Sequence, residues 1–250
     1  MTSSGDISGT DLASARRTVA LGCRVLAHRG LAEDVLGHVS VRVGEEEMLV
    51  RCRGPRESGL LFTTEDDVRR VDLEGRGELV GEYAVPNELP IHAELLRARP
   101  EVNAVVHAHP PSVLVAALAE LPLRPVFGAY NIPAMRLAAA GVPVYSRAVL
   151  IRRADLAREM VAAMGDSAVC VLRGHGVTTI GESVEQAVVR ALNLDVLARV
   201  TLDLARLDRP VSDMSSDDLA ELPDLGGAFN DLAVWRHQVA RLDWAGLGLA

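Results

Sequence analysis

Two histidines stand one residue apart near the middle of the chain, at the end of an apolar run. The segment reads Val105-Val106-His107-Ala108-His109 and is followed at once by two prolines. In a β-strand, side chains two residues apart point to the same face, and their Cα atoms are about 7 Å apart. Two imidazoles at that spacing reach one metal ion, each nitrogen about 2.1 Å from it. The pattern predicts a metal site, although two half-buried histidines at a strand end would give the same sequence.

A third histidine occurs in Gly174-His175-Gly176, shortly after a second apolar run that ends at Leu172. The flanking glycines free the backbone and leave space around the ring. Three histidines from two strand ends suit a catalytic metal site, where three protein ligands leave one coordination position open. Taken alone, Gly-His-Gly is also typical of a simple turn.

Glu88 lies four residues before His92, in a segment that starts with Pro86. Proline is favoured at the first position of a helix, so we expect a helix that begins near Pro86 and places both side chains on one face. A glutamate in a first helical turn is often there only because it interacts favourably with the helix dipole. Spacing alone therefore leaves the role of Glu88 open.

The overall composition narrows the class of protein. The 250 residues carry a formal net charge of −8, with 49% hydrophobic, 24% charged and 3% aromatic residues. This is typical of a globular chain of one or two domains. An acidic balance without a block of Lys or Arg argues against a nucleic-acid partner, because phosphates require a basic surface. We expect small molecules and sister subunits as partners.

Cysteine spacing and hydropathy point to the compartment. Cys23, Cys52 and Cys170 are odd in number and far apart, which excludes a disulfide framework and a CxxC motif. No apolar run approaches the roughly 18 residues of a membrane span. The N-terminal residues have neither a basic region nor an apolar core of a signal peptide. We therefore expect a cytoplasmic protein that does not bind membranes.

Helix and strand patterns alternate along the chain and predict one α/β unit behind a flexible tail, residues 1–9. Ser183 and Gln186 form a capping box ahead of a long helix. After residue 210 the composition shifts to Asp, Ser and Gly, which predicts a linker over residues 210–226 and then a last helix. The predicted helices cover residues 11–30, 86–96, 112–118, 154–164 and 184–207, and the predicted strands cover 38–43, 48–53, 60–62, 102–107, 142–144, 168–172 and 177–180.

Together these segments resemble the class II aldolase/adducin family over residues 10–208. The resemblance rests on Asn87-Glu88-x-x-x-His92, on Arg99-Pro100-Glu101-Val102-Asn103-Ala104-Val105-Val106-His107-Ala108-His109, and on Gly174-His175-Gly176. The family implies a three-layer α/β/α sandwich with a largely antiparallel central sheet. It also implies a homotetramer with active sites between subunits. Residues 209–250 would then be a linker and a C-terminal helical extension.

The resemblance also assigns roles to the candidate residues. His107, His109 and His175 match the family's ligands for one divalent metal ion per subunit. Glu88 matches its acid/base residue, which also contacts the metal when no substrate is bound. We expect zinc or manganese, and the same donors accommodate cobalt or iron. Adducin-like members that lack the histidines are not enzymes, whereas this chain retains all three, so we expect an enzyme.

The chain departs from the sugar-phosphate aldolases of the family where those enzymes bind phosphate. Their G-N-x-S turn, T-P-S-G-like loop and S-S pair are replaced by segments containing His38, Arg51, Arg53 and Asn87. Because a guanidinium binds a carboxylate with two hydrogen bonds, we expect Arg53 to hold a substrate carboxylate, unless it faces solvent. Asn87 is a further candidate. His38 either contacts the substrate or supports its loop, and His92 is expected to support the site or to pack.

The altered pattern is more similar to the family branch that decarboxylates hydroxylated aromatic or pyridine carboxylates, which also has G-H-x-S and P-N-E-x-x-I-H. We therefore expect a divalent-metal-dependent decarboxylase of a hydroxylated aromatic mono- or dicarboxylate. The metal would be the electron sink, and Glu88, with a pKa raised by burial, would donate and accept the proton. A metal-dependent aldolase acting on an unphosphorylated hydroxy-acid or sugar is the alternative, and a non-catalytic scaffold is a third hypothesis.

Overall fold

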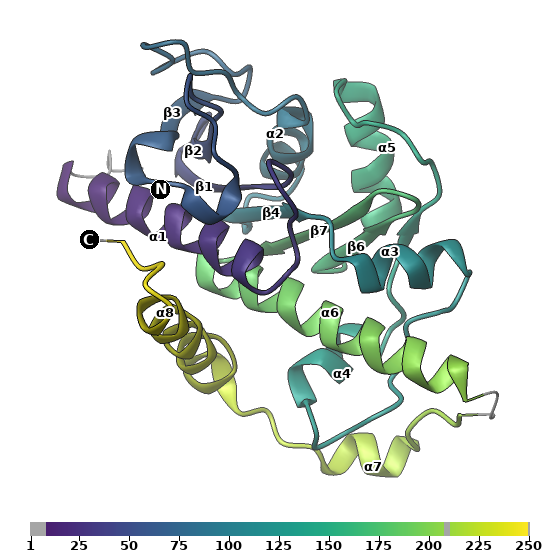
Figure 1. Ribbon diagram of the computed structural model, residues 1–250. Helices are drawn as coiled ribbons and strands as arrows, with labels where there is room; N and C mark the ends of the chain where they lie inside the picture. The colour runs from purple at the N-terminus through teal and green to yellow at the C-terminus, as the bar shows by residue number, and fades with distance from the viewer. Residues whose placement is uncertain (1–8, 208–210, 250) are drawn as a thin grey trace, which may run out of the picture.

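The computed structural model describes residues 9–207 and 211–249 and shows three layers, with a central sheet between two layers of helices (Figure 1). The seven strands are ordered β3-β2-β1-β4-β7-β6-β5, and every neighbouring pair is antiparallel except β5 with β6. The expected α/β/α sandwich with a largely antiparallel sheet is confirmed. The strands are β1 (His38–Gly44), β2 (Glu47–Arg51), β3 (Val68–Asp72), β4 (Ala104–Ala108), β5 (Val144–Tyr145), β6 (Val169–Leu172) and β7 (Gly176–Gly181).

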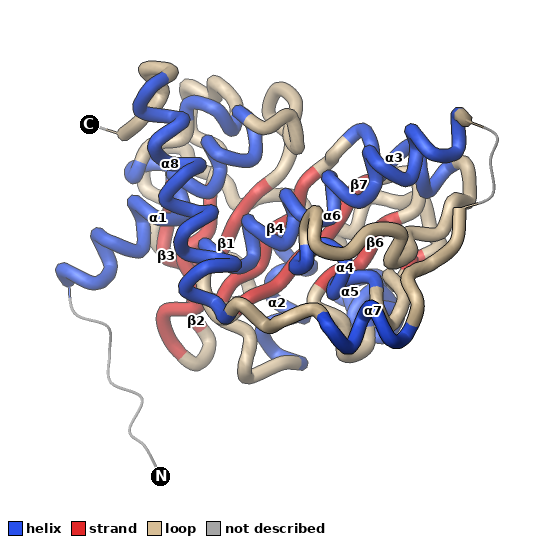
Figure 2. The backbone as a smooth tube through the Cα atoms, turned by 90° about the horizontal axis from the view of Figure 1, so that it is seen from below, coloured by secondary structure: helices blue, strands red, loops and turns tan. Residues whose placement is uncertain are grey.

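Helices cover both faces of this sheet (Figures 1 and 2). Helices α1, α3 and α6 pack on one face, and α4 and α8 lie outside them against α6, with α8 also contacting α1. The opposite face carries α2 and α5, which also contact each other. The helices are α1 (Gly9–His28), α2 (Leu89–Ala98), α3 (Pro111–Leu118), α4 (Ile132–Ala138), α5 (Ala154–Met164), α6 (Val184–Arg206), α7 (Ser216–Glu221) and α8 (Val234–Trp244).

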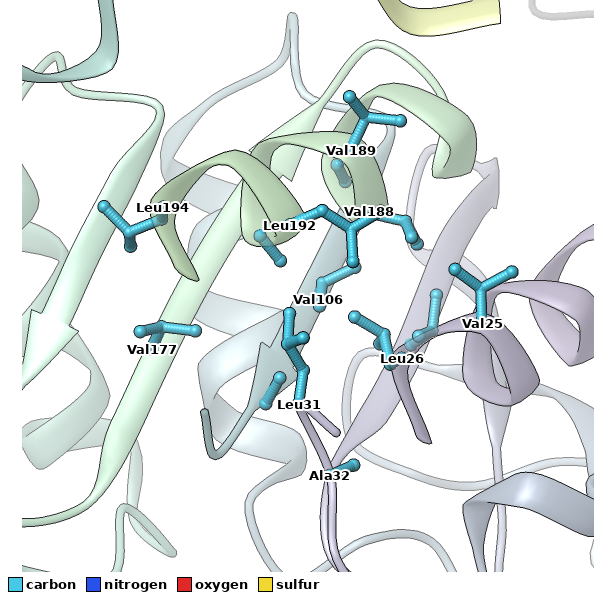
Figure 3. Close-up of a cluster of buried hydrophobic side chains, with 14 of the residues drawn as sticks. Val25, Leu26, Leu31, Ala32, Val106, Val177, Val188, Val189, Leu192 and Leu194 are labelled. Atoms are coloured by element: carbon cyan, nitrogen blue, oxygen red, sulfur yellow. The ribbon is translucent and has the colours of Figure 1, made fainter. Parts of the chain in front are cut away.

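The alternation of side chains along β4 divides the apolar core into two clusters. Val106 belongs to the cluster under α1 and α6, whereas Val105 belongs to the cluster under α2 and α5. Figure 3 shows Leu26 of α1, Val106 of β4 and Val188 of α6 pointing toward one another. By the same alternation, His107 lies on the face of the sheet that α2 covers. The core therefore fixes which side of β4 presents a histidine.

Most predicted elements are confirmed within a few residues, but Leu60–Phe62 is a short 3-10 turn and not a strand. Gly59 before it has φ +93°, a left-handed conformation that turns the chain, and Phe62 is 52% exposed. The place beside β2 is taken by Val68–Asp72, which pairs with it antiparallel. An apolar triplet without alternation was therefore a misleading strand signal.

Two helix boundaries also differ from the sequence interpretation. The helix expected from Pro86 begins at Leu89, because Glu88 has the non-helical dihedrals φ −100° and ψ 26°. The predicted linker over residues 210–226 contains the short helix α7, capped by the Ser215 hydroxyl, which accepts a hydrogen bond from the Asp218 backbone N–H at 3.1 Å. Two acidic residues in its first turn also favour the helix N-terminus.

The expected flexible tail falls outside the described residues except for Gly9, the first residue of α1. The division into a tail, a domain over residues 10–208 and an extension over residues 209–250 stays a prediction. Within residues 9–207 and 211–249, no helix combines the length and the hydropathy that crossing a bilayer requires.

The cluster under α1 and α6 supports a stability prediction. Leu26 is fully buried there, so Leu26→Ala should leave a cavity and lower the free energy of unfolding by about 2–5 kcal/mol. Chemical denaturation measures this change. Leu118→Ala is the control, because Leu118 is 55% exposed and its loss should change stability by about 0.5 kcal/mol or less. Equal effects of the two substitutions would contradict the described core.

Candidate metal centre

The predicted metal ligands come from three separate segments that meet where the inner strands β4 and β7 lie end to beginning. His107 is on β4 and His109 directly follows that strand. His175 lies in the tight turn between β6 and β7, and Glu88 precedes α2. Because β4 and β7 are antiparallel neighbours, the end of β4 lies beside the beginning of β7. The pairing therefore brings His175 to the histidine pair.

The donor atoms of these four side chains converge. One nitrogen of each imidazole and one carboxylate oxygen of Glu88 lie within 4.8 Å of one another. His107 Nε2 is 2.8 Å from His109 Nε2. Glu88 Oε2 is 3.3 Å from the Nε2 atoms of both His107 and His175. Three imidazoles and a carboxylate are a donor set that binds zinc and other divalent transition metals.

Surrounding groups orient two of the four donors. The His107 Nδ1–H donates to the Val177 carbonyl at 3.0 Å, so Nε2 keeps its lone pair and faces the cluster. The Ile151 backbone N–H donates to Glu88 Oε1 at 2.8 Å, which leaves Oε2 directed at the histidines. The Nδ1 atom of His175 is buried and has no hydrogen-bond partner among the described residues. The arrangement fits a divalent cation held by Nε2 atoms.

Burial keeps the histidines in the form that binds metal. Removal from water lowers the pKa of His107, and it lowers the pKa of His109 to about 3. Both rings are therefore neutral at physiological pH, and a neutral imidazole nitrogen is the one that coordinates a cation.

The pKa of Glu88 differs from the sequence expectation. Burial of the carboxyl group raises its pKa, but the close contacts of Glu88 Oε2 with the His107 and His175 rings outweigh this effect and lower it below its ordinary value. The expected raised pKa is therefore wrong for this arrangement, because the sequence could not show how closely the histidines surround the carboxyl group. Glu88 is therefore ionised in this arrangement.

His38 lies beside the cluster on the face of the sheet that α2 covers. It is the direct partner of His107 in the β1–β4 register, and the two ring centroids are 5.0 Å apart. Its Nδ1 atom is 2.6 Å from His92 Nε2, and His92 Nδ1 is 2.6 Å from the Ser40 hydroxyl oxygen. His92 is not one of the four converging donors. Its side-chain hydrogen bonds are with His38 and Ser40, and its role in the site stays a prediction.

The structure separates the two candidate arginines. Arg51 is buried and forms an ion pair with Glu57. Arg53 is half-buried, and its backbone pairs with Ala84 in the segment leading to Glu88. Its guanidinium has no hydrogen bond or ion pair with any described residue, which leaves it available to an anion.

Asn87 is exposed beside the buried Glu88 and is not hydrogen-bonded to the four converging donors within the described chain. Two neighbours of the cluster were missed by sequence reasoning. One is Ser40, and the other is Thr178, the register partner of His107 on β7. The Thr178 hydroxyl is buried without a described partner. Ser40 is the serine of the G-H-x-S pattern, to which the sequence analysis gave no role of its own. For Thr178 only the alternation of β7 was available, and alternation does not distinguish polar residues of the site from other inward-facing residues.

Comparison with known proteins agrees with this architecture. A model described as the class II aldolase and adducin N-terminal domain matches residues 17–202. The chain is 56% identical over 237 residues to 3,4-dihydroxyphthalate decarboxylase of Arthrobacter keyseri, covering 93% of this chain and 96% of that protein. It is 54% identical over 234 residues to the protein of the same name from Terrabacter sp. (strain DBF63), covering 92% and 98%.

A solved structure shares the fold at lower identity. The aldolase II superfamily protein from Pseudomonas syringae superposes with a TM-score of 0.79 at 19% identity, over 96% of both chains. The family model, the close relatives and the fold all agree with the metal-binding motifs of the sequence. The chain therefore belongs to the class II aldolase and adducin family.

Proposed function

We propose that this chain is a divalent-metal-dependent decarboxylase, a carbon–carbon lyase, whose substrate is the hydroxylated aromatic dicarboxylate 3,4-dihydroxyphthalate. The observation that carries the proposal is the convergence of three histidines and Glu88 in a chain closely similar to two decarboxylases of that name. The similarity to both decarboxylases extends over nearly their whole length. The aldolase and scaffold hypotheses therefore have less support.

The substrate explains why such a site is needed. One carboxylate of 3,4-dihydroxyphthalate is adjacent to a ring hydroxyl, and its loss as carbon dioxide gives 3,4-dihydroxybenzoate. The electron pair of the broken carbon–carbon bond stays on the ring, and the ring carbon takes up one proton. The reaction therefore requires stabilisation of negative charge near the ring oxygen and a group that delivers a proton to carbon.

The chain supplies both requirements. His107, His109 and His175, with Glu88 in the absence of substrate, would hold one divalent cation, which supplies Lewis-acid stabilisation of the negative charge. The ionised Glu88 accepts the proton of the ring hydroxyl and then returns it to the ring carbon as carbon dioxide leaves. The product phenolate takes its proton from water. The Ile151 N–H holds Glu88 in place during both transfers.

Three further residues are assigned to substrate binding. Arg53 holds the carboxylate that is retained, which is consistent with its unpartnered, half-buried guanidinium. His38 contacts the substrate beside His107, and the exposed Asn87 contacts it next to Glu88. The phosphate-binding segments of the sugar-phosphate aldolases are replaced here by these side chains. The Arg53 guanidinium can hold a substrate carboxylate with two hydrogen bonds.

Zinc or manganese is the cation we propose, since imidazole and carboxylate donors suit both, and cobalt or iron fits the same donors. The homotetramer, the cytoplasmic location and the absence of nucleic-acid and membrane partners stay predictions from the sequence.

Metal binding should depend on the converging histidines. We expect His109→Ala to lower the affinity for zinc or manganese by more than about 100-fold, since losing even a group that only supports a ligand costs about 10- to 100-fold. Elemental analysis and metal titration of the purified protein measure this. His237→Ala is the control, because His237 is an exposed histidine on α8. Equal metal content in both variants would contradict the site.

The reaction should require a hydroxyl next to the departing carboxylate. We expect the metal-loaded protein to release carbon dioxide from 3,4-dihydroxyphthalate and to form 3,4-dihydroxybenzoate. Chelation of the metal should abolish this release. The matched control compound is 4-hydroxyphthalate, which lacks the adjacent hydroxyl and should not react. Carbon dioxide release that persists without metal would refute the proposed chemistry, and aldehyde release from a hydroxy-acid would favour the aldolase.

Glu88 should be required for proton transfer. We expect Glu88→Gln to lower kcat by about 100- to 10,000-fold at saturating metal, which is the usual contribution of a general acid–base. Glu94→Gln is the control. Glu94 is a buried carboxylate like Glu88, but it lies within α2 and pairs with Arg97. Steady-state kinetics of both variants provides the test. Near wild-type kcat in Glu88→Gln would remove Glu88 from the mechanism.

A further inference from the structure

Three buried polar side chains form a hydrogen-bonded chain that ends beside the metal centre. The chain runs from the Ser40 hydroxyl to His92 Nδ1, at 2.6 Å, and from His92 Nε2 to His38 Nδ1, also at 2.6 Å. Ser40 and His92 are fully buried, and His38 is 5% exposed. The two contacts join β1 to α2, which are far apart in the sequence. None of the steps proposed above uses Ser40 or His92.

The hydrogens of this chain have two arrangements. In the first, Ser40 donates to His92 and His92 donates from Nε2 to His38 Nδ1, so the hydrogen of His38 is on Nε2. In the second, His38 donates from Nδ1 to His92, and His92 donates from Nδ1 to the Ser40 oxygen. The second arrangement leaves the Ser40 hydroxyl hydrogen in need of another acceptor.

Ser40 has no such acceptor among the described residues, since its side chain is hydrogen-bonded only to His92. A buried hydroxyl hydrogen without an acceptor costs free energy comparable to a lost hydrogen bond. The first arrangement gives the Ser40 hydroxyl hydrogen, both His92 nitrogens and His38 Nδ1 a partner, and leaves only the His38 Nε2–H open. The hydrogen-bond count therefore selects the form of His38 that carries its proton on Nε2.

The location of His38 beside the metal centre indicates what a hydrogen on its Nε2 atom could do. His38 is opposite His107 in the strand register, with ring centroids 5.0 Å apart, and its second ring nitrogen has no hydrogen-bond partner among the described residues. A ring that carries hydrogen on this nitrogen donates a hydrogen bond, and the bond to an ionised carboxylate is stronger than the bond to a neutral hydroxyl oxygen. The site would thereby favour a carboxylate over a hydroxyl.

We propose that Ser40 and His92 are positioning residues that hold His38 as an Nε2–H donor, and that this donor binds a carboxylate oxygen of the substrate next to the metal centre. The identity of the acceptor rests on the proposed function. The preference of His38 for a hydrogen on Nε2 does not rest on the proposed function, because it follows from the contacts of the substrate-free protein.

The hydrogen positions are measurable without substrate. In the full-length protein with isotope-labelled histidine, long-range proton–nitrogen correlation spectra distinguish Nδ1–H from Nε2–H. We expect Nε2–H for both His38 and His92. We expect Nδ1–H for His107, which donates to the Val177 carbonyl and serves as the internal reference. Nδ1–H at His38 would overturn the proposal.

Variants test whether Ser40 and His92 act through His38. In Ser40→Ala the donor is gone, so His38 should become a mixture of both forms, and KM should rise about twofold because only one form binds. Ser40→Thr keeps the hydroxyl and should restore both properties. His92→Phe removes the ring partner and should raise KM about 10-fold or more, the effect of losing one hydrogen bond to a charged group, with a smaller change in kcat.

Thr179→Val is the matched control, because it removes a buried hydroxyl on β7 of the same sheet that donates to the Ala187 carbonyl of α6. It should lower stability and leave KM and the His38 spectrum unchanged. Unchanged His38 spectra in Ser40→Ala, or an unchanged KM in folded His92→Phe, would overturn the proposal. If wild-type protein released no carbon dioxide from 3,4-dihydroxyphthalate while His38 still carried its hydrogen on Nε2, the proposed function would fail, not the hydrogen-bond chain.

Discussion

The antiparallel register of β1, β4 and β7 is the constraint on which the site depends. It places His38, His107 and Thr178 side by side in one row across the sheet. Because side chains alternate along a strand, a slip of one residue would turn His107 into the apolar cluster under α1 and α6. The register is held by that cluster, where Val106 packs against side chains of both helices.

The turn between β6 and β7 adds the third histidine, and glycine makes the turn close enough. Gly174 has φ +67°, a conformation that other residues rarely adopt. A side chain on Gly176 would collide with the Ala108 carbonyl oxygen and with the His109 ring. Without glycine at this position β7 could not lie so close to the end of β4. The two glycines therefore bring His175 and His109 within reach of one ion.

The polar side chains buried at the ends of β4 and β7 require hydrogen-bond partners. The Val177 carbonyl, the Ile151 N–H and the Ser40 hydroxyl each satisfy one side chain of the site. His175 Nδ1 and the Thr178 hydroxyl remain without described partners. Since unpaired buried polar groups are costly, their presence at the cluster fits a site whose polar groups serve binding and catalysis as well as folding.

The sequence revealed those features that depend on local spacing. The histidine pair, the Gly-His-Gly turn and the Ser183 cap of α6 are short patterns with a direct geometric meaning, and the structure has each of them. Of the predicted capping box only the Ser183 half forms, because the Gln186 side chain accepts from the Glu182 N–H. Local patterns failed at Leu60–Phe62, where three apolar residues form a 3-10 turn and pair with no strand. They also failed in the predicted linker, which contains α7. The lowered pKa of Glu88 and the bond between His38 and His92 depend on contacts between distant segments. No local pattern encodes such contacts.

The elements that carry the site explain how a family fold can serve more than one carbon–carbon cleavage. The three histidines come from the end of β4 and from the turn between β6 and β7. The residues that depart from the sugar-phosphate aldolases, including His38 and Arg53, lie on β1, at the end of β2 and before α2. The three histidines and these departing residues therefore belong to different segments of the chain, whereas Glu88, the fourth converging donor, directly follows Asn87. Substitutions on β1 or after β2 can change the surroundings of the donor cluster and leave the histidines in place, which is how one fold can host different activities.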